Sequence, residues 1–168
     1  LSQAAESIET PSFDFSYLAA ISAFNLGKWQ AAEFFFKKSL NQDGNPSEKI
    51  DPAKKAFFQS YYLGLAQFRL GKLESAYSTL EPLCQLNTRR GLDEAFFCIK
   101  RQHALSIALH CALQLYSKTQ ATSWWNRGCT LAHALMDRAE SPSQRQEAVL
   151  LTARLYGDGG KYQQALEL

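Results

Sequence analysis

The chain has 168 residues, of which 46% are apolar and 20% are charged, and its formal net charge at pH 7 is +2. This composition predicts a folded, soluble chain with a buried core, and it excludes a disordered one. The basic residues are scattered, which argues against a nucleic-acid-binding surface. No apolar run approaches the roughly 20 residues that span a bilayer, so we expect no membrane insertion.

Three capping residues followed by proline mark helix starts along the chain, at Thr10-Pro11, Asp51-Pro52 and Ser141-Pro142. Residues 1–10 precede the first of them and are predicted to be a flexible segment. Polar, turn-forming residues predict a loop over residues 41–52. The apolar spacing predicts helices over residues 11–26, 28–40, 52–70, 72–86, 92–117, 123–139 and 142–156, and the start of another from residue 161.

Taken in pairs, these helices predict one helical repeat domain over residues 11–168. Its hairpins are expected at residues 11–40, 52–86, 92–139 and 142–168. Glycines predict three of the turns, at Gly27, Gly71 and the GDGG run, whereas no glycine marks the turn of the third hairpin. Because the chain opens with Leu1 and ends in an apolar helical pattern, we expect it to be a fragment of a longer protein.

An internal repeat links the first two hairpins. Gly27 and Gly71 are 44 residues apart. Gly160 follows Gly71 by 89 residues, about twice that spacing, which leaves room for one divergent unit between them. At the offset of 44, Tyr17, Phe24, Trp29 and Ala32 correspond to Tyr61, Phe68, Leu73 and Ala76.

The segment from Tyr62 to Leu83 carries the clearest motif. Its large, small and turn positions are occupied by Leu63, Gly64, Gly71, Leu73, Ala76 and Leu80. This pattern resembles the tetratricopeptide repeat, and the resemblance implies an all-α fold, a right-handed α-solenoid of antiparallel helix hairpins. Ser60 and Gln67 stand where the motif prefers aromatic residues, and the units exceed its usual length of about 34 residues. A helical repeat of another type is the alternative.

The resemblance also implies a binding surface, because the first helix of each hairpin lines a concave groove in this family. An aromatic and aliphatic wall there suits an extended or helical peptide with apolar side chains. The alternative is that the aromatic residues pack between helices. Carried over position by position, the partner-binding residues are Tyr17, Ile21, Phe24, Asn25, Tyr61, Tyr62, Leu65, Phe68, Arg69 and Arg154, with Leu18, Glu147, Leu150 and Leu151 beside them.

No pattern predicts catalysis, a metal site or a cofactor. Cys129 and His133 are four residues apart, and His103 and His110 are seven apart, but the tight ligand spacing of a structural zinc site is missing. The GDGG run lacks the Lys-Ser/Thr that completes a phosphate-binding loop. We therefore expect a chain that is not an enzyme and holds no cofactor.

The four cysteines, Cys84, Cys98, Cys111 and Cys129, form no CxxC pair, and each lies in an apolar helical pattern. Buried free thiols are therefore preferred over disulfides. Free thiols favour an intracellular location, cytoplasmic or nuclear.

These features together predict a protein–protein interaction scaffold or adaptor. It would bind a protein or peptide partner in the concave groove, as part of a larger assembly. Two alternatives stay open: a structural segment that self-associates within a multi-subunit complex, and a peptide-sensing array that regulates an attached domain.

Overall fold

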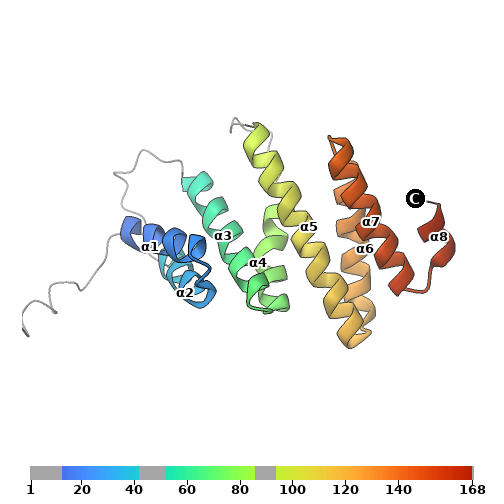
Figure 1. Ribbon diagram of the computed structural model, residues 1–168, viewed down its shortest axis with the longest axis horizontal. Coiled ribbons are helices and arrows are strands. Elements are labelled where there is room, and N and C mark those ends of the chain that lie inside the picture. Colours follow the sequence, from blue (N-terminus) through green and yellow to red (C-terminus); the bar gives the residue numbers. More distant parts are fainter. Residues whose placement is uncertain (1–12, 42–51, 86–93, 168) are drawn as a thin grey trace, which may run out of the picture.

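The computed structural model describes residues 13–41, 52–85 and 94–167. Figure 1 shows the helices in successive pairs, set side by side along the long axis of the molecule. The all-α prediction is confirmed within these ranges, whereas the segment 1–10 and most of the predicted loop lie outside them. The helices are α1 (Phe13–Asn25), α2 (Trp29–Leu40), α3 (Pro52–Arg69), α4 (Leu73–Gln85), α5 (Glu94–Thr119), α6 (Thr122–Asp137), α7 (Pro142–Asp158) and α8 (Tyr162–Leu166).

The helix bounds follow the apolar pattern closely. α7 runs through Asp158, two residues beyond the expected end at Tyr156. At its start, the Ser141 hydroxyl accepts a hydrogen bond from the Gln144 N–H, and the Gln144 side-chain oxygen accepts one from the Ser141 N–H, which completes a capping box. No helix within the described ranges is long and apolar enough to cross a membrane.

The turns of the first, second and fourth hairpins share one backbone conformation. Gly27, Gly71 and Gly160 have φ angles of 70°, 73° and 73°. In each turn the glycine N–H donates to the carbonyl three residues earlier, and the next N–H donates to the carbonyl five residues earlier, which is a Schellman closure. Glycine adopts this left-handed conformation without a steric cost, so the three predicted glycine turns are confirmed.

The third hairpin makes its turn with glutamine in the left-handed conformation. Gln120 has a φ angle of 54° and follows the end of α5 directly. Its side-chain amide donates to the Ser117 carbonyl at 3.2 Å, which satisfies one carbonyl at the helix end. The turn predicted between residues 117 and 123 is therefore confirmed, and it forms without a glycine.

Replacing Gln120 with glycine is expected to raise the free energy of unfolding by about 0.5 to 1 kcal/mol. Glycine adopts the left-handed conformation without the strain of about 1 to 2 kcal/mol that another residue has there. Part of this gain is lost because glycine gives up more conformational entropy on folding. Gln114→Gly, at an exposed position inside α5, is the matched control and should cost about 1 kcal/mol. Urea denaturation measures both, and equal destabilisation by the two changes would contradict the turn assignment.

The first helices of the hairpins lie next to one another. α3 packs against α1, α5 packs against α3, and α7 packs against α5. Each second helix packs against its own partner, and α2, α4 and α6 also pack against the first helix of the next hairpin. α4 and α6 meet as well, through the Tyr77 and Trp124 rings, whose centres are 5.1 Å apart. α1, α3, α5 and α7 therefore form one continuous side of the molecule (Figure 1), which we name the first-helix face.

The core runs through the row of helices because α3 contributes to two clusters. Leu63 and Ala66 of α3 pack with α1 and α2, whereas Phe57 and Tyr61 pack with α4, α5 and the helices beyond them. Tyr62 contacts both clusters. Stability therefore depends on contacts between neighbouring hairpins, as in repeat folds generally.

A buried carboxylate links the first hairpin to the second. The Glu33 side chain in α2 is 7% exposed, and its two oxygens accept from Lys37 at 2.8 Å and from Lys72 at 2.7 Å. Lys72 belongs to the turn of the second hairpin. Burial by itself raises the pKa of Glu33. The hydrogen bonds and charges of the two lysines lower it by more, so the net pKa lies below its ordinary value.

Glu33→Gln is expected to lower the free energy of unfolding at pH 7 by about 1 to 3 kcal/mol. Because the folded-state pKa lies below the unfolded one, the stabilisation is present above the unfolded pKa and is lost as pH falls through the folded pKa. In the Glu33→Gln variant, the free energy of unfolding should therefore fall less steeply as the pH is lowered into the acid range. Urea unfolding across a pH series checks this against Glu74→Gln, an exposed carboxylate in the first turn of α4. A profile identical to that of the wild type would contradict it.

Candidate partner-binding face

The predicted residues of α1 lie at the edge of the first core cluster. Tyr17, Ile21 and Phe24 are half-buried and pack against it, whereas Asn25 is exposed at the helix end. The Phe24 ring lies 5.1 Å from the Trp29 ring and 5.1 Å from the Tyr62 ring, each edge to face. Each of the three half-buried side chains therefore packs on one side and is accessible on the other.

The predicted residues of α3 differ sharply in exposure. Tyr61 is 2% exposed and belongs to the core, so its ring has almost no surface to offer a partner. Tyr62, Leu65 and Phe68 are half-buried, and Arg69 is exposed. The alternative that the aromatic residues pack between helices is therefore correct for Tyr61. Its three half-buried neighbours keep accessible surface.

The fourth hairpin places its predicted residues on several sides of α7. Leu151 is buried, whereas Leu150 and Glu147 are exposed. Arg154 is exposed as well, and its Nε lies 3.8 Å from a carboxylate oxygen of Asp158, one helical turn later. A surface ion pair of this kind contributes little stability, so the Arg154 guanidinium is available to a partner.

α5 completes the first-helix face with residues that the sequence interpretation did not include. The Nδ1 atom of His103 lies 2.6 Å from the Tyr61 hydroxyl. The Lys100 ammonium lies 5.2 Å from the centre of the Tyr61 ring and 5.9 Å from that of Tyr62. Between α5 and α7, the Ser106 hydroxyl donates to the Glu147 carboxylate. Without a glycine turn, α5 could not be aligned with the first helices of the other hairpins.

Charges from three helices act on the two histidines of α5. Partial burial lowers the pKa of His103, Lys100 and Arg69 lower it further, and Glu147 opposes them. Burial also lowers the pKa of His110, together with Arg154 and against Glu147.

At pH 7 both rings are therefore mainly neutral, since the ordinary histidine value is 6.5. Among the charged residues that act on them, the fixed charges are three cations, Arg69, Lys100 and Arg154, against one carboxylate, Glu147. Of the three cations, Arg154 also lies beside the carboxylate of Asp158.

Two of the four cysteines are buried, which disfavours their reactive thiolate form. Cys84 and Cys111 are buried free thiols, and burial raises the pKa of each to about 12. Cys98 and Cys129 are half-buried and also unpaired. No three His, Cys, Asp or Glu side chains converge on a metal position in this part of the chain. The arrangement is suited to binding through apolar and cationic side chains.

Comparisons of the chain with protein-family models, with curated proteins and with solved structures gave no match. The functional assignment therefore depends on the first-helix face itself.

Proposed function

We propose that the chain is a non-enzymatic protein–protein interaction module, a right-handed solenoid of the tetratricopeptide type. It binds a peptide segment of a partner on the first-helix face and acts as a scaffold or adaptor in a larger assembly. The observation that carries the proposal is the placement of half-buried aromatic residues and exposed cations on neighbouring first helices. An intracellular, cytoplasmic or nuclear location accompanies it, supported by the four unpaired cysteines.

The face favours a partner that combines apolar and acidic side chains. Tyr62, Phe68 and Phe24 supply aromatic surface that already has a rigid backing, which keeps the entropic cost of binding low. Arg69 and Arg154 lie at the two sides of α5 and attract carboxylates. An extended segment that crosses α3, α5 and α7 would meet both kinds of group.

Charge reversal on the face tests the proposal. The face variant Arg69→Glu/Arg154→Glu should lose its partners in affinity capture from the native source. The control variant Lys38→Glu/Arg127→Glu makes the same charge change on α2 and α6 and should retain them. Circular dichroism first verifies that both variants fold. Retention of every partner by the face variant would move the binding site elsewhere. An array that senses a peptide for an attached domain would use the same face.

Self-association is the second candidate, favoured by exposed apolar side chains on the first hairpin. Leu18 of α1 and Phe34 of α2 are each 62% exposed, and Phe15 and Leu26 are also exposed. At the repeat offset of 44 residues, Leu18 corresponds to Tyr62. The Tyr62 ring packs on the first hairpin with part of its surface, 5.1 Å from Phe24 and 6.0 Å from Phe36.

Leu18 therefore occupies the position where another hairpin would pack, from a second copy or from a neighbouring subunit. Sedimentation velocity should then show concentration-dependent dimers of the wild type. Leu18→Glu/Phe34→Glu should be monomeric, while Leu166→Glu, at an exposed position on α8, should behave as the wild type. A wild-type chain that stays monomeric at all concentrations would exclude this candidate.

A further inference from the structure

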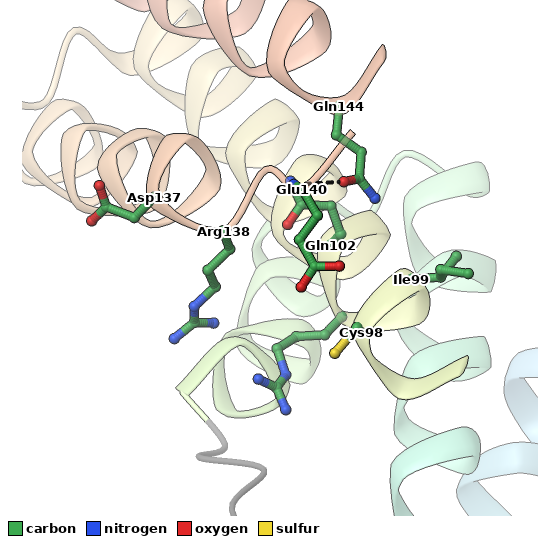
Figure 2. Close-up of a pocket in the computed structure, with 8 residues that line it drawn as sticks. Cys98, Ile99, Gln102, Asp137, Arg138, Glu140 and Gln144 are labelled. Atoms are coloured by element: carbon green, nitrogen blue, oxygen red, sulfur yellow. Dashed lines mark hydrogen bonds between the residues drawn. The ribbon is translucent and has the colours of Figure 1, made fainter. Parts of the chain in front are cut away.

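A second site lies where α5, α6 and α7 meet, apart from the first-helix face. It is a pocket of about 420 Å³ whose lining includes Arg101 and Gln102 of α5, Arg138 at the end of α6, and Glu140 and Gln144 at the start of α7. Figure 2 shows Arg138, Glu140 and Gln144 around the pocket, with the Glu140 side chain extending into it, and Asp137 at the end of α6 lines it as well. We name it the junction pocket.

Arg101 is the unusual residue of the junction pocket. It is 8% exposed, and its Nε–H has no hydrogen-bond partner in the described part of the chain. A buried guanidinium N–H without a partner is costly, because charged groups lose hydration on burial and are normally paired there. The packing that buries Arg101 therefore requires an explanation that the described side chains do not supply.

A second guanidinium faces the same pocket. Arg138 donates to the Cys84 carbonyl at the end of α4, with an Nη1–O distance of 2.6 Å, and this bond fixes the arginine in place. Burial lowers the pKa of Arg101, and the nearby Arg138 lowers it further. From α7, Gln144 in the first turn borders the pocket, and the N-terminal end of a helix favours negative charge.

We propose that the junction pocket binds a small oxyanion, the carboxylate or phosphate group of a ligand, between the guanidinium groups of Arg101 and Arg138. The planar donors of arginine match the paired oxygens of such groups. The pocket volume admits a ligand of a few atoms beyond the anionic group. Glu140 and Asp137 are the internal competitors, since both are exposed acidic residues that line the same pocket and repel an incoming anion.

The experiment follows the Nε–Hε signals of the arginines by proton–nitrogen NMR in the full chain. The signals are assigned by their loss in single Arg→Lys variants. Inorganic phosphate and succinate are titrated separately at constant ionic strength with chloride, which distinguishes the two sources of oxyanion. We expect saturable shifts of the Arg101 and Arg138 signals with at least one of the two. The signal of Arg127, an exposed arginine outside the pocket, should not move.

Two variants sharpen the result. Arg101→Lys keeps the charge, loses the planar donors, and should weaken binding at least about tenfold. Glu140→Gln removes one of the two competing carboxylates and should tighten binding several-fold. In anion-free buffer, Arg101→Met should keep or raise the melting temperature, because it removes a buried charge without a partner.

Three outcomes would overturn the proposal. The first is the absence of a saturable shift with both anions. The second is an equal shift of the Arg127 signal, which indicates general screening. The third is a large fall in the melting temperature on Arg101→Met, matched by Glu140→Gln, which would identify Glu140 as the partner of Arg101 in solution.

Discussion

Replacing Tyr61 with alanine is expected to lower the free energy of unfolding by about 3 to 5 kcal/mol. The Tyr61 ring is 2% exposed, stacks on Phe57 at 6.4 Å, and belongs to the cluster that joins α3 to α5. Its removal leaves a cavity at the contact between two hairpins, where repeat folds derive their stability. Urea denaturation monitored by circular dichroism measures the loss.

Two further variants separate packing from the hydroxyl group. Tyr61→Phe keeps the ring, removes the bond to His103, and should cost about 0.5 to 1.5 kcal/mol. Arg69→Ala, on the same helix but exposed, should change stability by less than about 0.5 kcal/mol. A loss on Tyr61→Ala as small as that on Arg69→Ala would show that the ring is not part of the core. Tyr61 is thus unsuitable for a binding test, because its loss affects folding first.

Gly64→Val should destabilise the chain by about 1 to 3 kcal/mol, and this is the second large effect. A Cβ atom built on Gly64 would lie 2.5 Å from Cγ and Cδ2 of Leu80, which is far inside van der Waals contact. Leu80 is fully buried in α4, so its side chain can move only by displacing closely packed neighbours. The close approach of α3 and α4 therefore requires glycine at this position.

Gly157→Ala is the matched control for this prediction. Gly157 lies in α7, and a Cβ atom there meets nothing within 4 Å. The substitution should raise the free energy of unfolding by up to about 1 kcal/mol, since alanine favours a helix over glycine. Thermal unfolding of both variants provides the comparison. Destabilisation by both changes, or by neither, would contradict the contact between Gly64 and Leu80.

The helices and three of the turns could be predicted because their signals are local. Gly27, Gly71 and Gly160 adopt the left-handed conformation that their positions required. Ser141 and the proline after it start α7 as expected. The turn between residues 117 and 123 was also predicted, from its polar residues, but the left-handed conformation of Gln120 was not, because glutamine is common in helices and gives no sign of it.

The candidate face could be predicted only in part. An aromatic stripe shows which side of a helix is apolar, but not whether a neighbour covers it. Tyr61 and Tyr62 are adjacent in sequence, yet Tyr61 is in the core and Tyr62 keeps accessible surface. His103 and Lys100 were missed because they meet α3 through packing between hairpins, which no repeat offset in the sequence revealed.

The most direct test of the proposed function is the dissociation constant of peptides selected from a random-sequence display library with the wild-type chain. The selected peptides should be rich in apolar and acidic residues. The face variant Arg69→Glu/Arg154→Glu should bind them at least about tenfold more weakly, and the control variant Lys38→Glu/Arg127→Glu should bind them as the wild type does. Equal affinity for the wild type and the face variant, or the absence of any selected peptide, would contradict the account.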